Sequence, residues 1–326
     1  MKIISELQSS QTSTGLCLST IPYAPLPIFN HIFFRLDEQA SLVAHGRPQH
    51  LLCYNLSEKD SRYNPDVPKS FKSFESARNS LDYIRTCAIR GQQSLPNAYT
   101  SGSQSEPTIP VQAADIKLSL HLIQNFTTIR LKQWSSAFES LLQEMNVLNE
   151  TERRAVAILK LHRELMGVNY SIHFVRAMSD EMIWDDFFDD FERMIAYAKE
   201  VTDVATRGQP SFTLDTEIIL PIYIVAVKCR HGGLRRKAIA LLQQEKRQEG
   251  VWNSLLTARV AERLVEIEEE GLDKGSVEAA EVTRWKRVAG VELSLATKHR
   301  SARLKYIKLR ADWTKEIIVE HLDWSD

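Results

Sequence analysis

The sequence lacks the features that identify membrane-spanning, secreted or strongly basic proteins. No stretch reaches eighteen consecutive apolar residues, so we expect no membrane span. The N-terminus has no signal-peptide core, because Glu6 lies where that apolar core would be. Lys and Arg number 41 against 42 Asp and Glu, giving a net charge of -1, whereas dedicated nucleic-acid binders are usually basic. These absences predict a globular intracellular protein in which any nucleic-acid contact is local.

Cysteine and histidine are too scattered to suggest a disulfide framework or a zinc site. Structural zinc needs about four ligands at close spacing. Cys53 has only His50 near it in sequence, and Cys229 has only His231, with no second pair beside either. We therefore expect free thiols, no metal and no other cofactor.

Motifs for catalysis are also absent. The chain has no GxSxG nucleophile motif and neither GxGxxG nor GxxxxGK[ST] to cradle phosphate. The nine histidines are dispersed, and His162 falls within a helical pattern, where a packed or exposed side chain is the simplest interpretation. We assign no catalytic residue from the sequence.

Apolar periodicity predicts a mostly α-helical, single-domain bundle or solenoid over residues 70–326. Residues 1–69 are irregular and rich in Ser, Thr and Pro, and we expect them to pack on that body. Helical spacing begins near Ser73, a polar loop covers 92–112, and successive helices fill 113–270. We expect one helix to start near Asp115, another to cover 131–145, and the last to cover 251–270, with Trp252 near its start. Asn149 is predicted to cap one of these helices, and Pro221 to lie in the first turn of another or kink it.

The C-terminal part changes to a strand pattern. VELSL and ARLKYIKL alternate apolar and polar residues on either side of ATKHRS. This pattern predicts a small β-hairpin at about 286–310. Two strands alone are marginally stable, so we expect the hairpin to lie on the helices.

One predicted helix is rich in aspartate. SDEMIWDDFFDDFERMIAYA contains DDxxD, which resembles the magnesium-binding motif of the helical terpene synthases, and Asp185 and Asp189 would share a helix face that can hold magnesium. The second motif of those enzymes is imperfect, because Asn253 and Thr257 fit but the acid falls one residue late, at Glu262. An acidic solvent face opposite an apolar stripe explains the pattern more simply.

A basic segment raises the possibility of DNA contact. Lys228 to Arg247 contains seven Lys or Arg and one acidic residue. Leu234, Ala238 and Leu241 form a buried helical stripe, so we place the arginines of the first turn on an outer face. No base-reading module accompanies them, and a helical hairpin with a basic face is the favoured interpretation. Our candidate partner-facing residues are Asp185, Asp186, Asp189, Asp190, Arg235, Arg236 and Lys237.

The same segment carries a family resemblance. VAVKCRHGGLRRKAIALLQQEKRQEGVWNSLLTARVAERLVEIEEEGL resembles the C-terminal regulatory region of fungal binuclear zinc cluster transcription factors. FKSFESARNSLDYI, LKQWSSAFESLL, TERRAVAILKLHRELM and the DDxxD helix are similar to that family in the same order. The likeness covers roughly residues 70 to 310. It implies a regulatory body that acts in the nucleus or cytoplasm.

The DNA-reading head of that family is missing. Its six-cysteine zinc cluster is represented only by TSTGLCLSTIPYAP, with Cys17 at the position of the final cysteine. The resemblance therefore implies a regulatory or interaction module without its own DNA-binding domain, linked to fungal secondary metabolism. Its expected partners are other proteins or further copies of itself, with a small-molecule effector possible and no sequence-specific DNA binding. The alternative is a helical fold recruited as an enzyme or small-molecule binder.

Overall fold

The computed structural model describes residues 66–93, 110–145, 147–171, 180–203, 211–244, 246–272, 277–296 and 301–323. Most of the segment predicted to be irregular, residues 1–69, lies outside these ranges. The described α-helices are α3 (Phe74–Gln93), α4 (Pro110–Glu144), α5 (Glu150–Ser171), α7 (Phe188–Asp203), α8 (Ile219–Lys228), α9 (Gly232–Gln244) and α10 (Ser254–Glu268). None of them is long and apolar enough to cross a membrane. The prediction of a mostly α-helical fold is confirmed.

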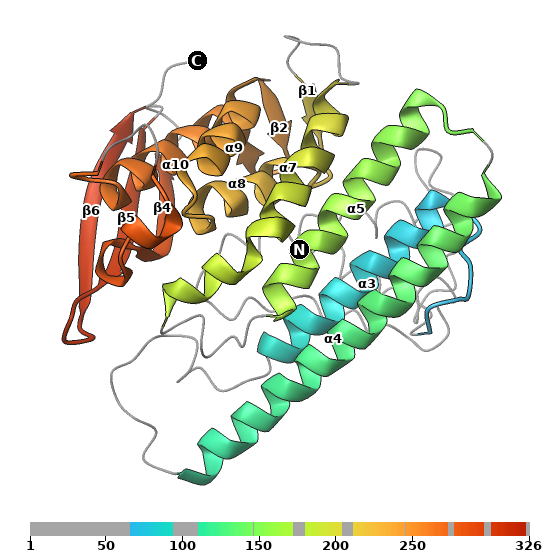
Figure 1. The fold of residues 1–326 in the computed structure, drawn as a ribbon, viewed down its shortest axis with the longest axis horizontal. Helices are drawn as coiled ribbons and strands as arrows, with labels where there is room; N and C mark the ends of the chain where they lie inside the picture. Colours follow the sequence, from blue (N-terminus) through green and yellow to red (C-terminus); the bar gives the residue numbers. More distant parts are fainter. Residues whose placement is uncertain are drawn as a thin grey trace, which may run out of the picture.

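At one end of the molecule, α3, α4 and α5 lie side by side (Figure 1). Their shared core is aromatic, with Trp134 of α4 stacked on Phe138 at a ring separation of 4.7 Å. The Trp134 indole N–H donates to the backbone carbonyl of Ala77 at 2.7 Å, which ties α4 to α3. This bond satisfies the one polar atom of a fully buried ring.

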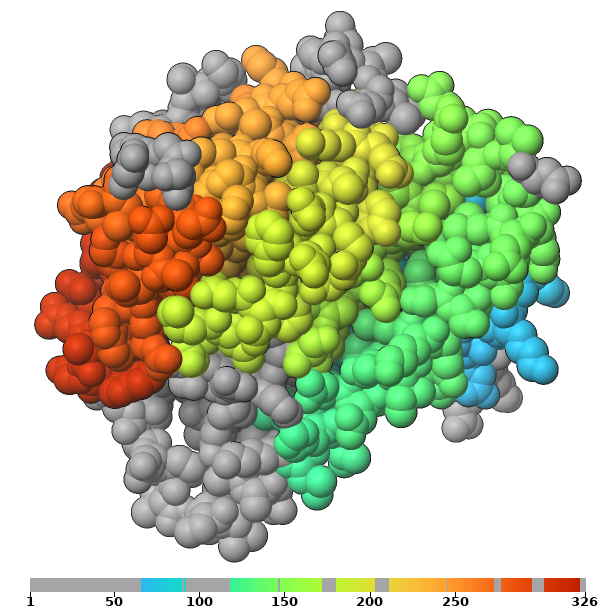
Figure 2. Space-filling model, in the orientation of Figure 1, coloured from blue at the N-terminus to red at the C-terminus, as the bar shows by residue number. Residues whose placement is uncertain are grey.

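Helix α5 separates two hydrophobic cores. Leu159 and Met166 face α3 and α4, whereas Leu161 and Leu165 face the second core, built mainly from α7, α8, α9 and α10. The space-filling view shows α7 between α5 and the C-terminal part of the chain (Figure 2). Asn149 begins α5 as predicted, because its side chain accepts from the Glu152 N–H at 2.9 Å.

The C-terminal sheet has three antiparallel strands, β4 (Val288–Ala296), β5 (Ser301–Leu309) and β6 (Lys315–Asp323), in the order β4-β5-β6. Leu304 and Tyr306 of β5 point into the second core. The predicted hairpin is confirmed as β4 and β5, but the prediction missed β6. Ile317, Ile318 and Val319 are consecutive, so β6 lacks the alternation by which a half-buried strand is recognised.

Several predicted boundaries differ from the structure. Residues 110–144 form one helix, α4, where two were predicted. Pro221 lies in the first turn of α8, as predicted. Trp252, predicted to open a helix, instead forms the short strand β3 (Trp252–Asn253), which pairs with β2 (Arg247–Glu249); β2 also pairs with β1 (Ser211–Thr213). The short 3-10 helices are η2 (Glu181–Phe187), η3 (Ala279–Glu281) and η4 (Arg284–Lys286).

Candidate functional site

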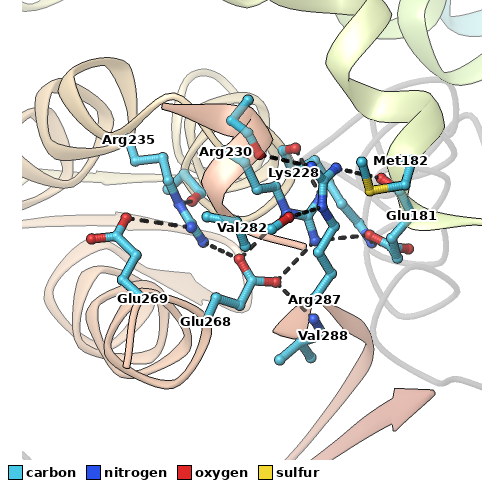
Figure 3. Close-up of polar contacts among 12 residues, drawn as sticks. Glu181, Met182, Lys228, Arg230, Arg235, Glu268, Glu269, Val282, Arg287 and Val288 are labelled. Atoms are coloured by element: carbon cyan, nitrogen blue, oxygen red, sulfur yellow. Dashed lines mark hydrogen bonds and ion pairs between the residues drawn. The ribbon is translucent and has the colours of Figure 1, made fainter. Parts of the chain in front are cut away.

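The basic segment and the acidic end of α10 meet inside the protein (Figure 3). Arg230, which follows α8, places Nη2 2.9 Å from Oε1 of Glu268. Arg235 of α9 places Nη2 2.7 Å from the other carboxylate oxygen, Oε2. The Val288 N–H at the start of β4 donates to Glu268 Oε1 at 2.7 Å. One carboxylate thus joins α8, α9, α10 and the sheet.

A second carboxylate extends this cluster toward η2. Glu181 accepts from Arg230 Nη2 at 2.9 Å and from Lys228 Nζ at 2.8 Å. Glu269 lies beside Arg235 on the far side, with Nη1 and Oε1 3.6 Å apart. We call Glu181, Lys228, Arg230, Arg235, Glu268 and Glu269 the buried ion cluster. All except Lys228, which is 17% exposed, are almost fully buried.

The charges of the buried ion cluster balance. Burial by itself would raise the pKa of Glu268, but Arg230 and Arg235 outweigh it and lower that pKa to about 2. Burial acts to lower the pKa of Arg230, and Glu268 and Glu181 outweigh it, so that the pKa is raised. Burial is the main cause of a lowered pKa at Arg235. Within the buried ion cluster, three cations therefore face three carboxylates, and their charges cancel.

The buried ion cluster explains where the structure places the three basic candidates, Arg235, Arg236 and Lys237. Placing Arg235 on the outer face was wrong, because its side chain is 0% exposed and points into the protein. Arg236 is 40% exposed, and its Nη2 lies 2.5 Å from Glu269 Oε2. Lys237 is exposed, as predicted. The segment has a much smaller basic surface than its sequence indicates.

The predicted acidic candidates also divide into paired and exposed residues. Asp185 was placed on a solvated face, but both its carboxylate oxygens bind Arg287, at 2.8 and 2.7 Å. Asp186 and Asp189 are exposed, as predicted, and Asp190 forms an ion pair with Arg193. The 3-10 helix η2 ends between Asp186 and Asp189, so the DDxxD residues do not share one regular helix.

The contacts of the second terpene-synthase-like motif are structural. Asn253 caps α10, since its Oδ1 accepts from the Leu256 N–H at 3.0 Å. Thr257 is buried, and Glu262 pairs with Arg259 at 3.1 Å. In the described ranges, no group of three or more His, Cys, Asp or Glu side chains is arranged to hold a metal ion.

A second buried polar network at the start of α8 was not predicted. Glu249 accepts from the N–H groups of Glu217, Ile218 and Ile219 at 2.8 to 3.1 Å, and burial raises its pKa to about 7. Nearby, burial lowers the pKa of His162 to about 3, so its ring is neutral. His162 Nε2 lies 2.9 Å from the Glu217 carbonyl and therefore carries the proton. Both residues secure the start of α8.

Apolar side chains lie exposed along α4. Leu118, Leu122, Phe126 and Ile129 are spaced by four, four and three residues, which places them on one helix face. Isolated exposed apolar residues are common, whereas a contiguous group is typical of a protein-contact surface. Sequence periodicity indicated the helix here but not which face the body leaves uncovered.

One comparison with known proteins supports a regulatory character. The chain is 41% identical over 73 residues to the aspercryptin biosynthesis cluster-specific transcription regulator atnN of Emericella nidulans. This match spans 22% of the chain and 12% of that regulator. No family model and no solved structure matches the chain. The chain therefore contains a region similar to part of a fungal transcription regulator.

Proposed function

We propose that the chain is a transcription-factor-like regulatory module that acts in the nucleus through contacts with other proteins. The observation that carries this proposal is its 41% identity over 73 residues to a biosynthesis cluster-specific transcription regulator. Because that relative is specific to a biosynthesis cluster, the similarity supports a link to a fungal secondary metabolic pathway. A partner protein would then select the DNA site.

The buried ion cluster supports a module that does not itself read DNA. A base-reading helix needs side chains that reach outward into a groove, with further cations on the phosphates. Arg230 and Arg235 instead point inward to Glu268, and Lys228 binds Glu181. These three cations hold the fold together. Few cations of the basic segment are therefore left to contact the phosphate backbone of DNA.

The exposed stripe on α4 supports contact with another protein. Its leucines at 118 and 122 are 59% and 60% exposed, on a helix that extends beyond the body in Figure 1. Burying such side chains against a partner stabilises a complex by about 25 cal/mol for each Å² of apolar surface removed from water.

A tethering experiment tests the proposal. The full chain is fused to a heterologous DNA-binding domain in a filamentous fungus carrying a reporter with that domain's sites. We expect the fusion to change reporter transcription relative to the DNA-binding domain alone. A matched fusion carrying Arg235→Ala, which we expect to destabilise the fold, should weaken the effect. Reporter output equal to that of the DNA-binding domain alone, with the fusion present in the nucleus, would refute the proposal.

A further inference from the structure

Strand β6 forms one edge of the C-terminal sheet and lies at the outer margin of the molecule (Figure 1). Within the described part of the chain it pairs with β5 alone, over all nine of its residues and without a register shift. Protein edges are usually protected by short strands, proline, bulges or charged side chains, because their unpaired backbone groups attract other strands. β6 is long and has no proline or bulge, and its charged residues, Lys315, Glu316, Glu320 and Asp323, leave the stretch from Ile317 to Val319 uncharged.

The centre of the outward face of β6 is apolar and lies between the exposed Lys315 and His321. Ile317 and Val319 are 55% and 42% exposed, whereas the alternate residues Ile318 and Leu322 pack toward the core. The inward-facing Glu320 is bound by Arg263, with Nε and Nη2 2.8 and 2.9 Å from its carboxylate. This ion pair neutralises the inward charge that would otherwise discourage a further strand.

We propose that β6 pairs antiparallel with β6 of a second copy of the chain, joining the two sheets into one six-stranded sheet. In such a two-fold arrangement, residues equally distant from the axis lie opposite each other. With the axis at Val319, all nine residues find a partner, Val319 meets its own copy, and Ile317 meets His321. Both outward apolar residues then gain a cross-strand neighbour on the same face of the sheet.

Shifting the axis by one residue to either side of Val319 also places core-facing residues of one strand opposite core-facing residues of the other. Both of these registers are less favourable. An axis at Ile318 places Glu316 opposite Glu320 twice, and an axis at Glu320 places that residue opposite itself. Like charges directly opposite one another destabilise a strand pair, and both registers also shorten the overlap. The strand is therefore self-complementary about Val319, which favours a second copy over an unrelated partner.

Cysteine cross-linking tests both the pairing and its register. Residues directly opposite in an antiparallel pair have Cα atoms about 4.5 to 5.5 Å apart, within the range that a disulfide spans. Val319→Cys should therefore cross-link into a dimer under mild oxidation. In Ile317→Cys the two cysteines would be displaced by roughly 13 Å along the strands, so this matched control should stay at the background of the wild-type cysteines.

Sedimentation of the purified full chain tests the interface independently. We expect the wild-type chain to dimerise, and Val319→Lys to weaken the dimer about tenfold or more, because two lysines meet at the axis. Ser294→Lys adds the same charge to an exposed position of β4, the strand at the opposite edge of the sheet, and should leave the dimer unchanged.

Three results would each overturn the proposal: a wild-type chain that is monomeric at high micromolar concentration, a dimer that persists in Val319→Lys, or equal cross-linking of both cysteine variants. Circular dichroism establishes that each variant is folded. The inference does not depend on the proposed regulatory role, since it concerns the isolated chain.

Discussion

Arg235 and Glu268 bind each other inside the protein, with Nη2 and Oε2 2.7 Å apart and both side chains at most 1% exposed. The two residues come from different helices, α9 and α10, and belong to a basic and an acidic stretch of the C-terminal half. In the sequence both stretches look like charged surface patches. In the structure they form an ion pair inside the protein. This difference bears on DNA binding, because cations held inside the fold cannot contact phosphates or bases.

The first prediction concerns the contribution of this buried ion pair to the stability of the protein. Arg235→Ala should lower the free energy of unfolding by about 3 to 5 kcal/mol, because it leaves the buried carboxylates of Glu268 and Glu269 without one of their cations. Lys237→Ala, on the exposed face of the same helix, should change it by less than about 0.5 kcal/mol. Urea unfolding of both variants and the wild type measures the difference. Equal effects would show that Arg235 is not buried in an ion pair.

The pKa of Glu268 predicts a loss of stability in acid. Its pKa is about 2 in the folded protein and near 4.5 when unfolded, so the unfolded chain binds the extra proton between these values. The stabilisation is therefore complete above about pH 5 and declines as the pH falls toward 2. A shift of this size corresponds to about 3 kcal/mol.

Comparison with Glu268→Gln isolates this contribution from those of other acids. The difference in unfolding free energy between wild type and Glu268→Gln should be largest near neutral pH and shrink as the pH falls from 4.5 toward 2. Denaturant titrations at several pH values measure this difference. If it stays constant with pH, Glu268 does not carry the shifted pKa.

The aspartate-rich segment gives a third prediction, because its members differ in their contacts. Asp185→Ala should destabilise the protein by about 1 to 3 kcal/mol, because it leaves the fully buried Arg287 without its carboxylate. Asp189→Ala, at an exposed position, should have little effect. Thermal unfolding distinguishes them. If Asp189→Ala proves the more damaging change, the assignment of a structural role to Asp185 is wrong.

The sequence was sufficient to predict the helices that have one apolar stripe. Leu81 and Ile84 of α3, and Leu234 and Ala238 of α9, recur at helical spacing and are buried. The ion pairs Arg259 with Glu262 and Arg263 with Glu266 also follow from the sequence, because residues three apart on a helix are neighbours whatever the tertiary fold.

The buried ion cluster could not be predicted from the sequence, for two reasons. Arginine is mostly exposed in proteins, so a periodicity argument assigns Arg235 to the surface. Its partner Glu268 lies far along the chain, and only tertiary packing brings the two together. One signal was present in the sequence: the basic start of α9 is followed by the acidic EIEEE at the end of α10, so that their charges offset.

A DNA-binding titration tests the central claim most directly. Fluorescence anisotropy of the full chain with promoter-derived and random duplexes should reveal at most weak attraction at low salt, equal for both duplexes. That attraction should disappear near 0.15 M salt, because it arises from counterion release at a few exposed cations such as Lys237. A preference for one duplex that survives at about 0.15 M salt would contradict the account and identify the chain as a reader of DNA sequence.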